Sequence, residues 1–280
     1  FASSFSRLRP CCRQSTALRG TETYQCRYGC RESRVAGSPQ PFGALKRAGG
    51  INSMSPFLGS IFVLLTLLIA VPSAVKVFNW LTTIWRGNIR FNPPMLFALG
   101  FVSLFISGGL TGIFLGNSAL DIHLHDTYFV VAHFHIVMGV SAFFGMFAGT
   151  YHWFPKMFGR FMNNTLGYIH FFVTFIGAYL IFWPMHYEGI AGMPRRYADY
   201  PMQFTDFNMI ASVGAFFFGF AQVYFFFFIV LPAMLGQGQK AAAKPWEASE
   251  GLEWEVPSPA PFHTFETPPK LDASATRVIG

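Results

Sequence analysis

The sequence predicts an all-α membrane protein, and three observations point to that fold class. Of its 280 residues, 52% are hydrophobic and only 12% are charged, whereas a soluble domain carries about 25% charged residues. The mean hydropathy is +0.38. Five stretches are almost free of charge, and each exceeds the roughly 20 residues that an α-helix needs to cross a bilayer. These observations exclude a disordered chain and a soluble nucleic-acid-binding protein.

The five predicted transmembrane helices make up a core that we assign to residues 55–235, although the last apolar stretch runs a few residues further. They span residues 57–85, 91–120, 127–155, 161–187 and 207–239. All are too long and too evenly apolar for the strands of a membrane barrel. Asn92-Pro93-Pro94 opens the second helix, because proline is tolerated in a first helical turn. After Leu235 the composition shifts to Gly, Pro, Glu and Lys, so residues 236–280 are expected to form a polar tail.

Residues 1–54 form a basic extension that contains every cysteine of the chain. The net charge of +7 belongs to residues 1–50, because the remainder of the chain sums to zero. An Arg-rich, Ser-rich and acid-poor segment is typical of mitochondrial targeting. We expect a targeting remnant with a retained extension, and the alternative is a poorly ordered basic arm. Disulfides and a zinc site are both open for the cysteines, which are Cys11, Cys12, Cys26 and Cys30.

The short loops predict the orientation of the helices. Basic residues without acids occupy the loops around residues 86–90 and 156–160. The positive-inside rule therefore places these loops and the C-terminal tail on the matrix side. The N-terminus and the loops 117–126 and 188–206 then face the intermembrane space. Arg195 and Arg196 depart from the rule, which favours a specific anionic partner for this pair.

Two histidines, His133 and His135, lie inside the third predicted helix. Two positions along a helix correspond to a rotation of about 200°, so the two side chains point to opposite sides and cannot ligate one metal. Either they are core histidines with internal hydrogen bonds, or they serve two centres that flank the helix. Two buried, opposed imidazoles favour two haems, since neutral imidazole is a common axial haem ligand.

Arg195 and Arg196 are candidates to bind the propionates of such haems. His133 lies seven residues after Asp126, roughly 10 Å below the outer end of its helix. Propionates at that depth can point toward the 188–206 loop, where guanidinium groups form strong bidentate bonds to carboxylates.

His125 and Asp126 stand at the outer end of the same helix. An imidazole beside a carboxylate suits a hydrated divalent cation such as Mg²⁺ or Mn²⁺. The alternative is an Asp126 that caps the helix beside a surface histidine, and the spacing leaves both interpretations open.

Lys76 lies within the first predicted helix, roughly 15 Å from Arg86. An intramembrane lysine is a candidate functional residue, and a proton path with Ser73 as a relay is the natural role. The alternative is a structural salt bridge to another helix, for which the five predicted helices offer no acid. Structural roles are expected for the three remaining membrane histidines, which are His152, His170 and His186.

Beyond these arguments, the run from His125 to His135 resembles the signature of the haem-copper oxidases, in the form found in subunit 1 of mitochondrial cytochrome c oxidase. The resemblance covers about residues 55–270 and continues through five further motifs, at residues 71–78, 108–112, 152–155, 192–197 and 261–266.

The resemblance implies a role for each matching residue. His133 would be the proximal ligand of haem a3 and His135 one axial ligand of haem a, with Phe134 between the two haems. His125 and Asp126 would bind magnesium above the oxygen site. Five more residues would act beside them: Arg195 and Arg196 on the haem propionates, Tyr128 near a propionate, and Lys76 with Ser73 in a proton path.

The same resemblance implies a partner chain. The family protein has twelve transmembrane helices, and this chain matches the last five. Nothing here matches the motifs that carry the copper B histidines, their linked tyrosine or the second haem a ligand, and His123, next to the signature, has no assigned role. We therefore expect the C-terminal half of a split subunit, which needs a separate N-terminal-half chain.

Under this interpretation the chain works in complex IV of the mitochondrial inner membrane. It would reduce dioxygen with electrons from cytochrome c, coupled to proton pumping, together with subunits 2 and 3 and accessory subunits. Three alternatives are a quinol oxidase of the same family, a stand-alone dihaem membrane cytochrome and a haem-free structural subunit. The last leaves Lys76, the arginine pair and the opposed histidines unexplained.

Overall fold

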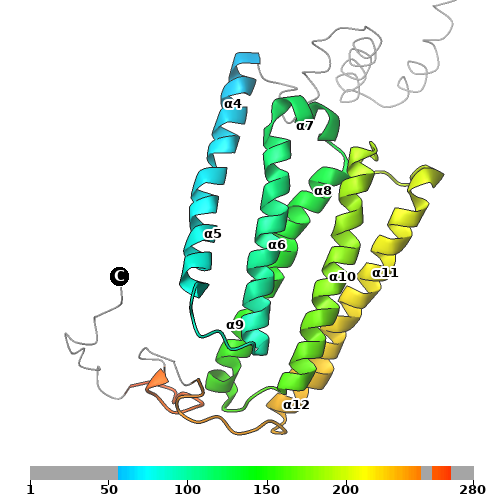
Figure 1. Ribbon diagram of the computed structural model, residues 1–280. Helices are drawn as coiled ribbons and strands as arrows, with labels where there is room; N and C mark the ends of the chain where they lie inside the picture. The colour runs from blue at the N-terminus through cyan, green and yellow to red at the C-terminus, as the bar shows by residue number, and fades with distance from the viewer. Residues whose placement is uncertain (1–55, 247–253, 266–280) are drawn as a thin grey trace, which may run out of the picture. The chain divides into compact units, whose positions relative to one another are not determined.

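The computed structural model (Figure 1) describes residues 56–246 and 254–265, and nearly all their regular structure is helical. The chain divides into two units between Leu64 and Leu65. Of the first unit, only the beginning of helix α4 (Pro56–Leu68) is described. The basic extension 1–54, its four cysteines, and residues 247–253 and 266–280 of the tail lie outside the described residues. The second unit contains the features discussed below.

Five helical stretches of the described residues are long and apolar enough to cross a membrane, as predicted. They run over Val63–Ile84, Pro93–Gly116, Tyr128–Phe158, Asn164–Ile190 and Met202–Met234. The helices beyond α4 are α5 (Ala70–Ile84), α6 (Pro93–Gly116), α7 (Ser118–Leu124), α8 (Tyr128–Phe134), α9 (Ser141–Phe158), α10 (Asn164–Ile190), α11 (Thr205–Tyr224) and α12 (Leu231–Met234). Two π-helical segments, η3 (His135–Val140) and η5 (Phe225–Val230), and one 3₁₀ turn, η4 (Met202–Phe204), lie between them.

Local sequence signals set several of these boundaries. Asn92 precedes α6, whose first turn holds the two prolines. The expected continuation of this helix to residue 120 is wrong, because Asn117 is extended and its side chain accepts a hydrogen bond from the Ala119 amide at 3.0 Å, which starts α7. At the other end of the bundle, α9 stops at Gly159, whose φ of +69° closes the last turn through a hydrogen bond to Pro155.

The core between α6, η3, α9 and α10 is built largely of aromatic rings. Phe97 and Phe144 are fully buried, and their ring centroids lie 5.4 Å apart. Tyr151 stacks on Phe97 at 5.5 Å, and Phe171 meets it edge to face at 5.2 Å. Offset and edge-on pairs of this kind add to the energy of burial, so this cluster fixes how the helices that carry the candidate site pack.

Small residues let α10 and α11 run antiparallel at close range (Figure 1). A Cβ atom on Gly177 would lie 3.0 Å from the backbone nitrogen of Phe218, and one on Gly214 would lie 2.8 Å from that of Ile181. Close approach at glycine is a common basis of helix association in membranes. The close pairing brings the polar side chains of α11 against α10.

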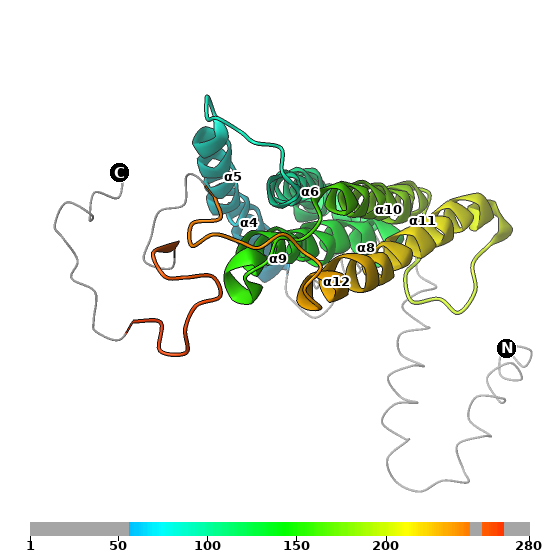
Figure 2. The same cartoon turned by 90° about the horizontal axis from the view of Figure 1, so that it is seen from below.

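The helix α5 differs from the rest of the unit, because none of its described residues is buried. Viewed from below (Figure 2), it lies beside α6 and apart from the group formed by α8 to α11. Its apolar side chains are therefore available to lipid or to other helices.

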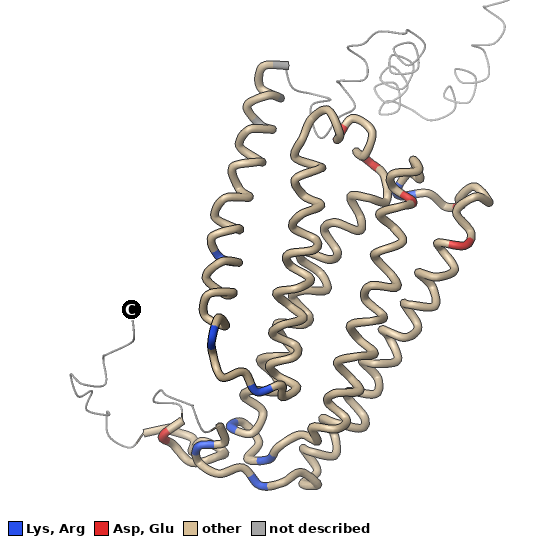
Figure 3. The backbone as a smooth tube through the Cα atoms, viewed as in Figure 1, with Lys and Arg blue, Asp and Glu red and all other residues tan. Residues whose placement is uncertain are grey.

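The charged residues gather at the two ends of the helices (Figure 3). Among the described residues, most Lys and Arg lie at the end near α12, and most Asp and Glu lie at the end near α7. The one basic residue inside α5 is Lys76. The expectation that the predicted helices contain no acid needs correction, since α10 extends past residue 187 and includes Glu188.

The described part of the tail folds back onto the end of α9. Arg160 donates to the Gly238 carbonyl at 2.8 Å, and the Trp246 indole donates to the His152 carbonyl at 2.9 Å. Lys156 is buried and donates to the carbonyls of Ala243, at 3.1 Å, and Val256. The polar tail predicted from composition is thus attached to the membrane bundle.

Candidate functional site

The helix α8 and its continuation η3 carry the two signature histidines. Thr127 caps α8, because its hydroxyl accepts a hydrogen bond from the Phe129 amide at 3.3 Å. His133 lies in the last turn of α8, and the π-helical segment η3 begins at His135. Segments of this kind occur frequently at functional sites. The α8–η3 junction is therefore the centre of the candidate site.

His133 faces α6. Its Nδ1 lies 2.9 Å from the Gly108 carbonyl and 3.0 Å from the Thr111 hydroxyl. A Cβ atom on Gly112 would lie only 2.7 Å from Cε1 of the His133 ring. The imidazole is thus oriented through Nδ1 by α6, against a helix face that lacks a side chain at Gly112.

His135 faces α10 instead. Its ring stacks on Phe182, with centroids 4.9 Å apart and planes inclined by 14°. Its Nδ1 lies 2.8 Å from the Val131 carbonyl. The two histidines therefore meet different neighbouring helices, as their spacing predicts.

Both imidazoles fit the role of an axial haem ligand. Each holds a hydrogen-bond partner on Nδ1, which orients the ring and leaves Nε2 as the ligating atom. No hydrogen bond to either Nε2 is present in the part of the chain that the structure describes. Phe134, between them in sequence, is 38% exposed and lies 4.3 Å from the His135 ring.

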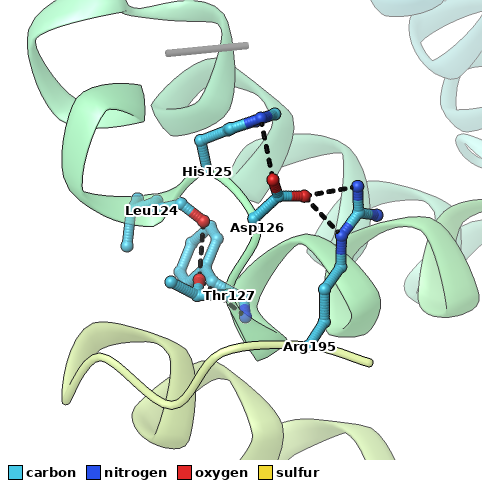
Figure 4. A network of polar contacts seen from close by, with 6 residues as sticks. Leu124, His125, Asp126, Thr127 and Arg195 are labelled. Carbon is cyan, nitrogen blue, oxygen red and sulfur yellow. Dashed lines mark hydrogen bonds and ion pairs between the residues drawn. The ribbon is translucent and has the colours of Figure 1, made fainter. Parts of the chain in front are cut away.

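Just before α8, Asp126 joins two loops that are distant in sequence (Figure 4). Arg195 contacts one carboxylate oxygen of Asp126, through Nη2 at 2.7 Å and Nε at 2.8 Å. The other oxygen lies 3.3 Å from His125 Nε2. Asp126 has a φ of +58° and does not cap the helix, since Thr127 does. The capping alternative for Asp126 is therefore wrong.

Backbone hydrogen bonds fix the loop that carries the arginines. The Tyr128 amide donates to the Met193 carbonyl at 3.0 Å, and the Arg195 amide donates to the Asp126 carbonyl at 2.9 Å. The Met193 amide in turn donates to the Glu188 carbonyl at 2.9 Å. The residue after Arg195, Arg196, has a φ of +63° and is exposed.

The electrostatics favour an ionised Asp126. Partial burial raises its pKa, but the Arg195 hydrogen bond and the charges of His125, Arg195 and Arg196 bring the pKa below its ordinary value of 3.8. Burial raises the pKa of the nearby Asp121 above its ordinary value. The charge of His125 lowers this pKa, and the charge of Asp126 raises it further. The Asp126 carboxylate is therefore available to a cation, whether Arg195 or a metal ion.

Lys76 and Ser73 are not brought into this group. Both lie on α5, where Lys76 is exposed and the Ser73 hydroxyl donates to the Ile69 carbonyl at 3.0 Å. Within the described ranges, no group of three or more His, Cys, Asp or Glu residues is placed to hold a metal ion. The His125–Asp126 pair alone offers two candidate ligands.

No specific role was predicted from the sequence for several residues that the structure places at the site. Gly108 and Thr111, noted only as part of a matching motif, orient His133. His186, for which a structural role was expected, packs edge-on against Phe129 with ring centroids 5.1 Å apart. Glu188 is fully buried, and neither carboxylate oxygen has a hydrogen-bond partner among the described residues. The only sequence signal for Glu188 was an acid directly after an apolar run.

Comparison with known proteins identifies the family. Residues 51–217 match the family model described as "Cytochrome C and Quinol oxidase polypeptide I". The chain is 48% identical over 219 residues to "Alternative cytochrome c oxidase subunit 1" of Bradyrhizobium diazoefficiens. The matched region covers 76% of this chain and 36% of that protein. The chain is 47% identical over 214 residues to "Cytochrome c oxidase subunit 1" of Cereibacter sphaeroides, covering 76% and 38%.

A solved structure shares the fold. The chain is similar to a chain of a "heme-copper terminal oxidase dimer" with a TM-score of 0.58 and 20% identity, over 66% of this chain and 38% of that chain. This chain spans little more than a third of the length of the relatives that it matches. It nonetheless belongs to the cytochrome c and quinol oxidase polypeptide I family, the multi-pass membrane subunit I family of the haem-copper oxidases, whose members bind haems and copper.

Proposed function

We propose that this chain is part of the catalytic core of a cytochrome c oxidase, which reduces dioxygen to water with electrons from cytochrome c and pumps protons. The observation that carries the proposal is the pair His133 and His135. Their imidazoles meet α6 and α10 respectively, with Nδ1 engaged and Nε2 available. Family membership supports a haem for each of them.

In this proposal His133 is the proximal ligand of haem a3 and His135 is an axial ligand of haem a. The haems, when bound, supply the electron-transfer and oxygen-binding chemistry. The chain supplies oriented imidazoles: hydrogen bonding at Nδ1 fixes each ring and raises the basicity of the ligating nitrogen. Phe134 lies between the two ligands in sequence and is proposed to separate the haems.

The outer loops would neutralise the negative groups of the cofactors. Arg195 and Arg196 are proposed to bind the haem propionates, with Tyr128 nearby. His125 and Asp126 are proposed to bind Mg²⁺, which takes carboxylate and water ligands readily. Their support is the 3.3 Å approach of His125 Nε2 to Asp126 and the ionised state of that carboxylate.

Lys76 and Ser73 are proposed to line a proton path. Lys76 lies on a helix without buried residues, so helices outside the described chain would have to enclose it. Lys76→Met should slow oxygen reduction while both haems stay bound, because the ammonium group carries protons and does not contact haem. Loss of haem in this variant would instead assign Lys76 a structural role.

Copper B and the second haem a ligand are proposed to come from a separate N-terminal-half chain. Within the described ranges, no group of three or more His, Cys, Asp or Glu residues is placed to hold copper, so its ligands would have to come from elsewhere. We assign residues 1–54 to a targeting remnant, 55–235 to the membrane core and 236–280 to a matrix-side tail. Subunits 2 and 3 and accessory subunits would complete complex IV.

The proposed location is the mitochondrial inner membrane, with the N-terminus toward the intermembrane space and the C-terminus toward the matrix. The basic composition of residues 1–54 and the basic loops at one end of the helices support it. A quinol oxidase is the second candidate, because the family description includes quinol oxidases.

Purification of the native complex tests these proposals together. Haem extraction should yield two A-type haems, and sequencing of every polypeptide should find a chain that carries the copper histidines. Two b-type haems would support a dihaem cytochrome, and no haem would support a structural subunit. A full-length twelve-helix subunit 1 in the same complex would overturn the split arrangement, as would a single long polypeptide that contains this sequence.

A further inference from the structure

A hydrogen bond between two hydroxyl groups joins α6 to α10 beside the two signature histidines. The Ser107 hydroxyl on α6 lies 3.2 Å from the Tyr179 hydroxyl on α10, and both side chains are partly buried. The Ser107 hydroxyl already donates to the Leu104 carbonyl at 3.1 Å. Since a serine hydroxyl has a single proton to donate, Tyr179 is the donor and Ser107 the acceptor in the bond between them.

The two helices joined by this bond each contact one of the histidine rings. Helices α6 and α10 lie side by side, and α8 with η3 packs against both of them (Figure 2). His133 faces α6 through its Nδ1, whereas His135 stacks on a ring of α10. The Ser107–Tyr179 hydrogen bond therefore links the surroundings of one imidazole to the surroundings of the other.

On α6, the bond lies next to the residue that orients His133. Ser107 directly precedes Gly108, whose carbonyl lies 2.9 Å from His133 Nδ1. A Cβ atom on Gly108 would lie 2.9 Å from the backbone nitrogen of Val137 in η3, so α6 and η3 approach closely at this point. A displacement of α6 at Ser107 would therefore move the Gly108 carbonyl relative to the imidazole.

On α10, the bond lies one turn from the residue that stacks on His135. Tyr179 precedes Phe182 by three positions, which places the two side chains on one face of the helix. The Phe182 ring stacks on the His135 ring with centroids 4.9 Å apart. The Tyr179 ring is itself held edge-on against Phe175, with centroids 5.0 Å apart. A displacement of α10 at Tyr179 would therefore move Phe182 relative to His135.

Direct side-chain contacts between α6 and α10 are otherwise aromatic and lie at a different depth. Among the residues that the structure describes, no second hydrogen bond joins a side chain of α6 to one of α10. Phe97 meets the rings of His170 at 5.0 Å and Phe171 at 5.2 Å, near the beginning of both helices. Ser107 follows Phe97 by ten residues, roughly 15 Å along the axis. The aromatic core thus holds one end of the helix pair, and the Ser107–Tyr179 bond joins it at the depth of the histidines.

We propose that Ser107 and Tyr179 are positioning residues that hold the imidazoles of His133 and His135 in one fixed arrangement. The inference rests on the proposed function, in which each imidazole ligates a haem. Ser107 acts through the carbonyl that follows it, and Tyr179 acts through the ring one turn further along α10. Loss of either hydroxyl releases α6 from α10 at this depth, so the two haem sites change together.

Spectroscopy of the native complex with Ser107→Ala and with Tyr179→Phe tests this proposal. Each substitution removes one hydroxyl group, and both variants should retain two haems. The iron–histidine stretching band of the haem at His133 should broaden and move to lower frequency, because a weaker hydrogen bond at Nδ1 lowers the basicity of the ligating nitrogen. The electron paramagnetic resonance g values of the haem at His135 should shift, because they depend on the orientation of the imidazole plane.

A double variant and a matched control separate positioning from general stability. Ser107→Ala with Tyr179→Phe should change both signals no more than either single substitution does, because the two substitutions break the same bond. Tyr168→Phe is the control. The Tyr168 hydroxyl donates to the Phe91 carbonyl at 3.0 Å, on the same helix but roughly 16 Å from Tyr179 along the axis. Its loss should leave both signals unchanged.

Unchanged signals in the single variants would overturn the proposal, as would a change at only one of the two haems or additive changes in the double variant. Equal changes in Tyr168→Phe, or loss of haem from the single variants, would show a merely structural role and would overturn it too. These outcomes are separable from the proposed function, which the unaltered complex tests by itself. An unaltered complex without haem would overturn the proposed function, and this inference with it.

Discussion

Arg195 contacts a single carboxylate oxygen of Asp126 with two of its nitrogens, Nη2 at 2.7 Å and Nε at 2.8 Å. The contact joins the loop after α10 to the start of α8, and it leaves the second oxygen toward His125. A forked, charge-assisted contact of this kind gives geometric specificity as well as energy. It positions one guanidinium directly beside the carboxylate of the proposed cation site.

Neutral replacement of both arginines, Arg195→Gln with Arg196→Gln, should lower the midpoint potentials of bound haem. Removing two positive charges near the propionates favours the more positive, oxidised iron. The effect on stability should be small, about 1 kcal/mol or less, because Asp126 is solvent-exposed. Redox titration of the purified complex measures the potentials, and unchanged values would contradict the placement of the arginines. Arg195→Lys with Arg196→Lys, which keeps both charges, is the control.

Gly112→Ala should reduce the haem content of the complex. The new Cβ would lie 2.7 Å from Cε1 of His133, so the ring or α6 must shift away from its present position. Gly109→Ala is a matched control three positions earlier on the same helix, where a Cβ meets nothing within 4 Å. The ratio of haem to protein, measured by pyridine haemochrome and amino-acid analysis, should fall only for Gly112→Ala. An equal effect of the two substitutions would show that the His133 contact is not the cause.

Gly189→Ala should destabilise the membrane bundle. The added Cβ would overlap the backbone of Phe129, including its amide nitrogen, and would force α10 away from α8. Overpacking of this kind costs about 1–3 kcal/mol. Gly219→Ala on α11 is the control, since a Cβ there meets nothing within 4 Å. Thermal melting of both variants in one detergent compares them, and a melting temperature of Gly189→Ala equal to the control would disprove the close contact.

Lys156→Met should release the tail from α9. The ammonium group donates to the carbonyls of Ala243 and Val256 and lies 5.8 Å from the Trp254 ring centroid. Hydrogen bonds to a charged group contribute about 1.5–3 kcal/mol, and this replacement removes them. The control is Lys244→Met, which should have little effect because Lys244 is exposed. Limited proteolysis should therefore cleave the tail of Lys156→Met faster than that of Lys244→Met. Equal rates would show that other contacts hold the tail.

Glu188→Leu should stabilise the protein, by about 1–3 kcal/mol, because it removes a fully buried carboxyl group that has no hydrogen-bond partner among the described residues. Leucine has a similar volume and buries only apolar atoms. The melting temperature of the purified complex should rise, whereas Glu188→Gln, which stays polar, should give no such gain. A fall in melting temperature with Leu would indicate that Glu188 has a partner outside the described residues.

The sequence alone was sufficient to predict the fold class and the positions of the five long helices, because helix length and apolarity follow directly from the bilayer thickness. The same holds for the opposite directions of His133 and His135, since a helix turns by a fixed angle per residue. Boundaries were less secure. The second helix is predicted to continue to residue 120, whereas Asn117 starts the separate helix α7. The fourth is predicted to end at residue 187, whereas α10 continues to Ile190.

The tertiary structure alone decided which distant residues meet. Thr111 and Gly108 orient His133 because α6 packs against α8. Arg195 reaches Asp126 because backbone hydrogen bonds join two loops that are separated in sequence by two membrane-length helical stretches. The contact between the Tyr151 hydroxyl and His170 Nδ1, at 3.1 Å, likewise arises only when α9 and α10 pack together. The physical reason is that periodicity and composition are local properties of the chain. Side-chain partners between helices depend on the angle at which the helices cross and on close approach at small residues. Neither can be deduced from the sequence of one helix alone.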